Sequence, residues 1–264
     1  MTAQVAARRT RVEHIWGTAI GVDIRDPAGT ALVDSVFDWF RRVDDLFSTW
    51  RPDTEISRLG RRELAEADAS PEVRRVLELC DLVSIQSGGA FDVTVGADPR
   101  VTPREGLGVI DPSGLVKGWA LDQAAAMLEG EGIVNFTINA GGDVVTRGRP
   151  LPALEWRVGI QHPWIKDKLA AVVAGTDLAV ATSGRYERGE HIVDPRTGRP
   201  PAGLMAVTVV GDDLALADGY ATAAIVLGAD GMQWLAELVG VEGMGITESR
   251  EVVTTEGFDQ YRRR

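Results

Sequence analysis

The stretch from Ala181 to Thr222 contains side chains that can act on a metal-bound phosphate ester. Hydroxyl, guanidinium, imidazole and carboxylate groups occur there close together in sequence; they are Ser183, Arg185, His191, Asp194, Arg196, Asp218 and Thr222. Carboxylate and hydroxyl oxygens are the hard ligands that Mg²⁺ prefers, cationic side chains bind phosphate oxygens, and imidazole is a general base near neutral pH. These residue types therefore indicate phosphoryl chemistry assisted by a divalent cation.

Asp218 and Thr222 are four residues apart in an apolar, helix-like run that ends at Gly228. Because residues at this spacing lie on one face of a helix, both oxygens could contact one Mg²⁺ that keeps water and phosphate oxygens as its other ligands. Asp218 could equally be a helix N-cap and Thr222 a solvated threonine, since such roles are common. The spacing alone leaves both interpretations open.

His191 begins a short β-favouring run, and residues 194–198 then predict a turn, because Pro195 presets φ and Gly198 permits φ > 0. An imidazole at the end of an element can be both held and exposed, which suits a general base. A structural histidine is the alternative interpretation.

Several runs occur in the order typical of one enzyme family. They are W-G-T, F-S-T-W-R-P-D-T-E-I-S-R-L, G-G-A-F-D-V-T-V-G, K-G-W-A-L-D, N-A-G-G-D, S-G-x-Y-E-R, H-I-V-D-P-R-T-G-R-P and A-D-G-Y-A-T-A-A-I-V-L-G, between Trp16 and Gly228. This order resembles the ApbE-like FAD:protein FMN transferases. Two departures are visible: Gly60 stands where the family pattern has an asparagine, and the stretch from Gly96 to Leu107 is shorter than the family norm.

The resemblance implies a Mg-dependent enzyme that breaks the pyrophosphate of FAD. It would join FMN through its phosphate to a Ser or Thr hydroxyl of an acceptor flavoprotein and release AMP. Such chemistry needs a metal to neutralise the pyrophosphate and assistance for a poor hydroxyl nucleophile. Two alternatives remain: a Mg-dependent FAD pyrophosphatase that gives FMN and AMP, and a non-catalytic FAD-binding or carrier protein.

The family motifs also imply roles for individual residues. Asp218 and Thr222 are predicted metal ligands together with the backbone carbonyl of Val116, and His191 is the predicted general base. The predicted FAD-binding residues are Thr18, Asp92, Lys117, Asn139, Gly141, Gly142, Asp143, Ser183, Gly184 and Arg185. Lys117 and Arg185 are the candidates for phosphate contacts, and the paired glycines would let backbone N–H groups approach the ligand.

Composition narrows the class of protein and its environment. The formal net charge of −11 and the sequence pI near 4.8 argue against a nucleic-acid-binding surface, which needs clustered basic residues. Cys80 is the single cysteine, which excludes an intramolecular disulfide and favours a reducing compartment. The sequence has no signal-peptide h-region, lipobox or long apolar stretch, so we expect no transmembrane segment and a cytoplasmic location, although many relatives resemble exported lipoproteins.

We expect one domain, residues 12–257, between an N-terminal tail (1–11) and a C-terminal tail (258–264). Strand-like and helix-like runs are partly segregated, which favours an α+β fold with mixed or antiparallel sheets over a doubly wound parallel sheet. The predicted elements include a strand from Glu13 to Ile24 broken by glycines, a helix capped by Thr30, a helix starting at Ser70-Pro71-Glu72, and an extended run from Phe91 to Gly96.

Overall fold

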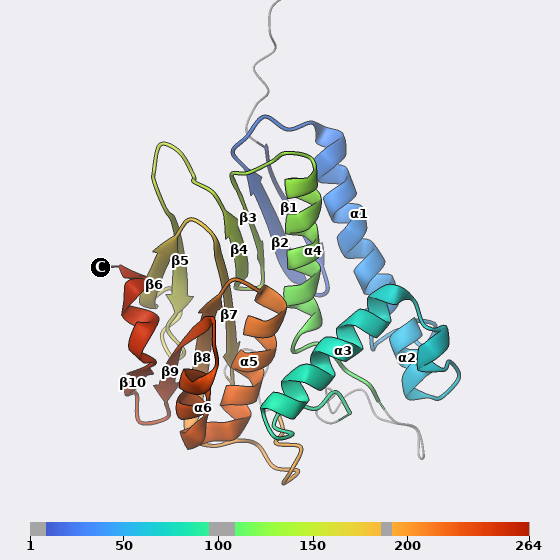
Figure 1. Ribbon diagram of the computed structural model, residues 1–264, viewed down its shortest axis with the longest axis vertical. Helices are drawn as coiled ribbons and strands as arrows, with labels where there is room; N and C mark the ends of the chain where they lie inside the picture. Colours follow the sequence, from blue (N-terminus) through green and yellow to red (C-terminus); the bar gives the residue numbers. More distant parts are fainter. Residues whose placement is uncertain (1–8, 95–108, 186–191, 264) are drawn as a thin grey trace, which may run out of the picture.

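The computed structural model describes residues 9–94, 109–185 and 192–263. An eight-stranded sheet lies between a layer of helices and a smaller three-stranded sheet (Figure 1). All of the strand pairings are antiparallel, which confirms the predicted α+β class. Within the described residues, no helix is both long and apolar enough to cross a membrane.

The eight-stranded sheet consists, from edge to edge, of β1 (Arg9–Ile15), β2 (Thr18–Ile24), β3 (Phe136–Ala140), β4 (Asp143–Arg147), β7 (Leu178–Gly184), β8 (Leu204–Gly211), β9 (Val241–Thr247) and β10 (Val252–Thr254). The small sheet has the order β11 (Arg262–Arg263), β6 (Leu169–Gly175) and β5 (Trp156–Gln161). The helices are α1 (Thr30–Phe47), α2 (Glu55–Gly60), α3 (Pro71–Gln86), α4 (Val116–Gly130), α5 (Leu214–Leu227) and α6 (Gly231–Glu237), with short 3-10 turns η1 (Glu66–Asp68), η2 (Gly228–Asp230) and η3 (Glu256–Gln260).

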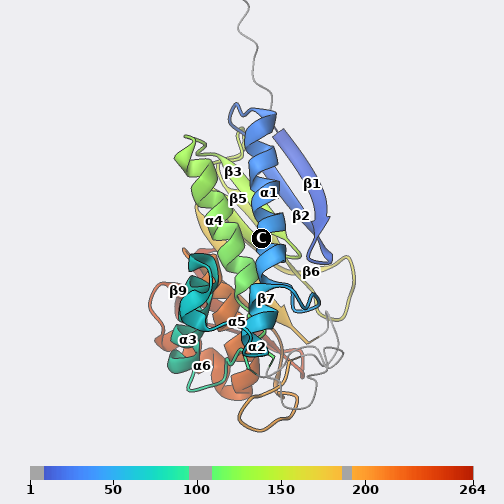
Figure 2. The same cartoon turned by 90° about the vertical axis from the view of Figure 1, so that its right-hand side faces the viewer.

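The two faces of the large sheet bury separate hydrophobic clusters. The larger cluster packs strands β2, β3, β7 and β8 against α1, α3, α4 and α5, and it includes Phe37, Phe40 and Leu121. The smaller cluster packs the opposite face against β5, β6 and η3, and it includes Val173 and Phe258. Helices α1 and α4 run side by side over the first strands, as Figure 2 shows. This burial on both faces holds the sheet rigidly against α4 and α5.

Local signals predicted some element boundaries well. Helix α3 begins as expected: the Ser70 hydroxyl accepts a hydrogen bond from the Val73 N–H at 3.4 Å, and Pro71 is the first helical residue. The helix ends before Gly88 and Gly89, which both have positive φ. Helix α1, in contrast, starts at Thr30 itself, so its N-cap is Gly29 and the prediction of Thr30 as the cap was wrong.

Two segments that were predicted to be extended contain turns in the structure. The expected strand from Glu13 to Ile24 is a hairpin of β1 and β2, because Trp16 and Gly17 adopt φ of 58° and 71° and reverse the chain. In the run from Phe91 to Gly96, Asp92 Oδ1 accepts a hydrogen bond from the Thr94 N–H at 2.7 Å and forms an Asx-turn. Residues 95 and 96 lie outside the described part of the chain.

The two chain ends contribute to the fold beyond the domain limits expected from the sequence. Strand β1 begins at Arg9, inside the expected tail of residues 1–11. At the other end, Phe258 is fully buried and β11 pairs with β6, although residues 258–264 were expected to be a tail. Residues 9–11 and 258–263 therefore belong to the packed structure.

Helices α4 and α5 are joined closely at one point. A Cβ built on Gly118 would lie 2.3 Å from the Leu214 carbonyl oxygen, so only glycine permits this approach. One turn further along α4, Asp122 Oδ2 accepts hydrogen bonds from the Leu214 and Ala215 N–H groups, each at 2.9 Å. These contacts hold the start of α5 at a defined position along α4.

We expect Gly118→Ala to destabilise the protein by about 1–3 kcal/mol or more, because the added methyl group overlaps backbone atoms that can move only if the helices separate. Gly130→Ala in the same helix is the matched control, since nothing lies within 4 Å of a Cβ built there. Urea unfolding of both variants measures the difference. Equal stability of Gly118→Ala and Gly130→Ala would contradict the close packing.

Asp122 predicts a pH dependence of stability. Burial raises the pKa of Asp122 from 3.8 to about 7, and the charge of Asp213 adds to the rise, while the two backbone donors oppose it. Between pH 3.8 and 7 the folded protein therefore holds a proton that the unfolded chain has released. This stabilising contribution falls as the pH rises through that window and is lost above it. Asp122→Asn, which does not titrate, should lack this component of the stability profile in urea unfolding at several pH values; parallel profiles would contradict it.

Candidate functional site

The predicted site residues converge on a cavity of about 540 Å³ where α1, α4, α5 and the end of β7 meet. Its lining also includes the β1–β2 turn, the loop after α1, residues 90–92, residues 111–117 and residues 192–195. Eight of the predicted residues line it: Thr18, Asp92, Val116, Lys117, Ser183, Gly184, Asp218 and Thr222. Asn139, Gly141, Gly142, Asp143 and Arg185 lie outside the lining formed by the described residues. The general-base candidate, His191, falls outside those residues.

Asp218 and Thr222 lie one turn apart on α5 and both reach the cavity. Asp218 is 4% exposed, and its Oδ2 accepts a hydrogen bond from the Gly118 N–H at 3.3 Å. Thr222 Oγ1 lies 2.9 Å from Ser183 Oγ on β7. The helix N-cap is Asp213, whose Oδ1 accepts from the Leu216 N–H at 2.8 Å, so the N-cap interpretation of Asp218 was wrong. Asp218 is instead a buried carboxylate inside the helix.

The donor set at this point fits a partly hydrated hard cation. It offers one carboxylate and two hydroxyls, from Asp218, Thr222 and Ser183, beside Val116 at the start of α4. No group of three or more His, Cys, Asp or Glu side chains suited to a metal ion occurs among the described residues. A metal bound here would therefore keep several ligands from water or substrate, which is how proteins usually hold Mg²⁺.

Lys117 provides a positive charge in the same cavity. It lies in the first turn of α4, and its Nζ is 2.6 Å from Asp143 Oδ2. Asp143 is 1% exposed, and its Oδ1 accepts a hydrogen bond from the Thr182 N–H at 3.2 Å. Asp143 thus lies behind Lys117 and orients it, which differs from the direct FAD contact expected of Asp143 from the motif. A lysine held at a helix N-terminus suits phosphate oxygens.

The Asn139–Asp143 glycine turn joins β3 to β4 and supports the cavity from behind. Asn139 Oδ1 accepts a hydrogen bond from the Gly142 N–H at 3.3 Å, and Gly141 and Gly142 have φ of 61° and 101°. A Cβ on Gly141 would lie 2.8 Å from Thr18 Oγ1, so glycine lets the turn pack against a side chain that lines the cavity.

Arg185 follows β7, and its guanidinium pairs with Glu248. The guanidinium that was predicted to contact phosphate is therefore paired with an acidic side chain in this structure.

The predicted turn at 194–198 is present. Asp194 forms an isolated bridge with Arg199, and the Thr197 and Gly198 N–H groups donate to the Asp194 carbonyl. The Arg196 guanidinium, 2.9 Å from the Asp194 carboxylate, lowers the pKa of that carboxyl.

Sequence reasoning missed part of the lining. Trp16, Asp44, Phe47, Trp50 and Asp111 line the cavity. Trp50 is 63% exposed and lies in the family motif at 47–59, so the motif could have identified it as a site residue. Asp44 precedes that motif, and its residue type carries no signal of its own.

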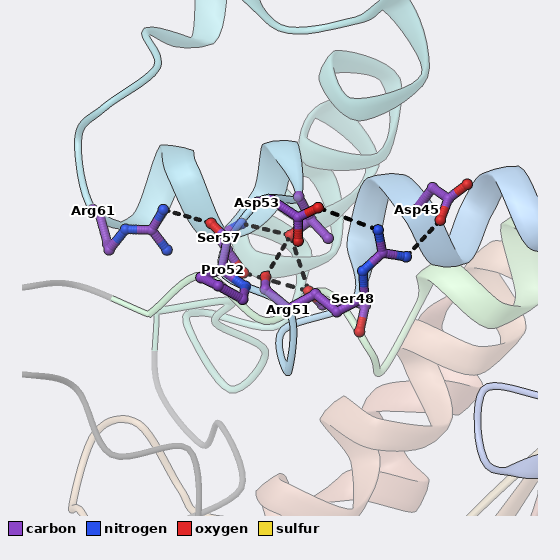
Figure 3. Close-up of polar contacts among 8 residues, drawn as sticks. Asp45, Ser48, Arg51, Pro52, Asp53, Ser57 and Arg61 are labelled. Atoms are coloured by element: carbon purple, nitrogen blue, oxygen red, sulfur yellow. Dashed lines mark hydrogen bonds and ion pairs between the residues drawn. The ribbon is translucent and has the colours of Figure 1, made fainter.

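A polar network holds the loop that carries Trp50, as Figure 3 shows. The Thr54 hydroxyl donates to the Ser48 carbonyl at 2.9 Å, Arg51 pairs with Asp45 and Asp53, and Arg61 donates to the Pro52 carbonyl. The expected polar turn therefore continues into helix α2, whose last residue, Gly60, is buried and outside the cavity lining of the described residues.

Comparisons with known proteins agree with the sequence resemblance. The model of the ApbE family matches residues 16–102 and 100–244. The FAD:protein FMN transferase of Vibrio cholerae is 29% identical over 83% of this chain and 78% of that protein, and that of Klebsiella pneumoniae is 29% identical over 99% and 89%. The solved flavin transferase ApbE from Vibrio cholerae has a TM-score of 0.82 at 26% identity and covers 97% of this chain and 99% of its own. The ApbE protein from Thermotoga maritima, at 22% identity, has the same fold with a TM-score of 0.84 over 98% and 100%. The chain therefore belongs to the ApbE family.

Proposed function

We propose that this protein transfers FMN from FAD to a Ser or Thr hydroxyl of an acceptor flavoprotein in a Mg-dependent reaction. The observation that carries the proposal is the convergence of Asp218, Thr222 and Lys117 on one cavity large enough for part of a dinucleotide. The relatives named above are FAD:protein FMN transferases, which supports the same reaction for this chain.

In the proposed reaction the acceptor oxygen forms a bond to the phosphorus of the FMN half. The bond between that phosphorus and the bridging oxygen breaks, and AMP leaves with the bridging oxygen. The proton of the acceptor hydroxyl goes to a general base, for which His191 is the candidate from the motif. The products are a phosphoester-linked FMN and AMP, and no oxidant or reductant is required.

The charged residues of the cavity have separate roles in this proposal. Asp218 and Thr222 would hold Mg²⁺ together with Val116, and the ion would neutralise charge on the pyrophosphate. Lys117, oriented by Asp143, would bind a phosphate oxygen. Because the whole chain is acidic, an anionic dinucleotide depends on such local positive charge.

The aromatic lining suits the flat rings of the substrate. Trp16, Phe91 and Trp50 reach the cavity from three separate segments. Trp16 is also fixed against Phe40, with ring centroids 5.4 Å apart. An aromatic side chain fixed in this way binds planar ring systems with little loss of side-chain entropy.

We expect the protein to bind FAD more tightly than FMN, because AMP can be a leaving group only if the adenylate half is also held. Titration of intrinsic tryptophan fluorescence with each flavin, in EDTA to prevent turnover, measures both affinities. Equal affinity for FAD and FMN would count against the transfer reaction and against the pyrophosphatase alternative as well.

A further inference from the structure

Asp44 is one of four carboxylates that line the cavity, with Asp92, Asp111 and Asp218, and the only one of the four that comes from α1. It lies in the last turn of α1, next to Val43 and Phe47, which also line the cavity. Its side chain is half-buried, and within residues 9–94, 109–185 and 192–263 no hydrogen bond or ion pair holds its carboxylate. An acidic group placed in this way needs a reason, since the proposed ligand is an anion.

The nearby cation does not neutralise Asp44. Arg51 directs its guanidinium to Asp45 Oδ1 at 2.5 Å and to Asp53 Oδ2 at 3.3 Å, as Figure 3 shows. Asp45 and Asp53 are both exposed, with 64% and 70% of their side chains accessible, and neither lines the cavity of the described residues. The ion pairs of Arg51 are thus made with two surface acids; its charge still acts on Asp44, but the Asp44 carboxylate keeps its capacity to accept hydrogen bonds from a ligand.

The charge of Asp44 restricts which part of a dinucleotide can lie beside it. Two like charges 4 Å apart repel strongly when solvent is partly excluded, so a phosphate next to Asp44 would weaken binding. Lys117, the cavity lysine, is paired with Asp143. Burial raises the pKa of Asp44, which Arg51 opposes and the charge of Asp45 reinforces. The groups of FAD that suit Asp44 are therefore uncharged donors: ribityl or ribose hydroxyls, the flavin imide N–H or the adenine amino group.

We propose that Asp44 is a specificity-determining residue whose carboxylate accepts a hydrogen bond from an uncharged O–H or N–H group of FAD and keeps phosphates away from its part of the cavity. The inference rests on the proposed function, which places FAD in this cavity. A hydrogen bond from a neutral donor to a carboxylate is stronger than one between two neutral groups. The phosphates would then be confined to the part of the cavity formed by Lys117, Asp218 and Thr222.

Substitution of Asp44 should weaken FAD binding if an uncharged donor lies beside the carboxylate, and should strengthen it if a phosphate lies there. Asp44→Ala should weaken FAD binding by about 10- to 100-fold, and Asp44→Asn, which keeps a carbonyl acceptor, by less. Asp38→Asn is the matched control, because it removes an exposed carboxylate of the same helix outside the cavity lining of the described residues. Affinity is measured by fluorescence titration in EDTA, with a thermal melt of each variant to confirm folding.

Tighter FAD binding by Asp44→Asn would overturn the proposal, because it would place the carboxylate beside phosphate. Unchanged binding by Asp44→Ala would overturn it too. Titration of the Asp44 variants with riboflavin and with ADP locates the donor. Weaker binding of riboflavin supports a donor on the flavin half of FAD, and weaker binding of ADP supports a donor on the adenosine half. If the unmodified protein fails to bind FAD, the proposed function itself fails; if it binds FAD and the variants bind equally well, only the role of Asp44 fails.

Discussion

Asp218→Asn is expected to reduce FAD turnover by about 10²- to 10³-fold at a fixed, low Mg²⁺ concentration. Asp218 is a carboxylate 4% exposed on the cavity face of α5, and the amide keeps its size while removing the charge that, in the proposed function, would draw Mg²⁺ out of water. Loss of several kcal/mol of metal-derived stabilisation corresponds to a rate loss of this order. Turnover against Mg²⁺ concentration measures it, and the half-saturating concentration should rise together with the rate loss.

A control variant and a variant of the second proposed ligand separate the metal site from the helix. Asp213→Asn changes an acid of the same helix that serves as its N-cap, and asparagine caps well, so turnover should stay close to that of the unmodified protein. Thr222→Val should do less harm than Asp218→Asn, because a neutral hydroxyl is a weaker ligand than a carboxylate. Normal turnover by Asp218→Asn at low Mg²⁺ would show that the metal binds elsewhere.

His191→Ala is expected to reduce transfer by about 10²- to 10⁴-fold while FAD binding stays within a few-fold. The expected rate loss is that of a removed general base, since the acceptor hydroxyl is a poor nucleophile without proton removal. The prediction rests on the family motif, because His191 lies outside the residues that the structure describes. Single-turnover transfer at saturating FAD, together with a binding titration, separates the two effects.

His162→Ala is the control for the histidine variant. The His162 ring accepts hydrogen bonds from the Trp164 and Ile165 N–H groups in the β5–β6 connection, and it does not line the cavity of the described residues. Its removal should leave transfer unchanged. A His191→Ala protein that melts at a much lower temperature but still transfers FMN would indicate the structural histidine of the alternative interpretation.

Features that depend on a few neighbouring residues were predictable from the sequence. The start of α3 at Ser70 and Pro71 and the turn at 194–198 follow from capping and from proline and glycine geometry, and both are present. The β1–β2 hairpin was missed, because its reversal requires a positive φ at Trp16, which that residue type does not signal. Local chemistry thus predicted boundaries where the residue type itself restricts the backbone.

The site was predictable only as far as the family motifs extend. The motifs brought Lys117, Asp218 and Thr222 together, but a motif cannot show whether a side chain faces the ligand or a neighbour. Asp143 illustrates this, since it lies behind Lys117, and Arg185, which pairs with Glu248, is a second case. Asp44 was missed because its position at the cavity results from the packing of α1, which no local pattern reports.

The most direct test of the proposed function is covalent flavin on an acceptor. The protein is incubated with FAD, Mg²⁺ and an acceptor of the class of flavoproteins that normally carry phosphoester-linked FMN. The acceptor is produced in cells without an FMN transferase, so that it starts without covalent flavin. After denaturation, in-gel fluorescence and the intact mass of the acceptor report bound flavin, and chromatography reports AMP. We predict one FMN on a Ser or Thr of the acceptor for each AMP released, and neither product in EDTA. Free FMN and AMP with an unmodified acceptor would indicate the pyrophosphatase, and intact FAD would indicate the carrier; either result would contradict the transfer reaction.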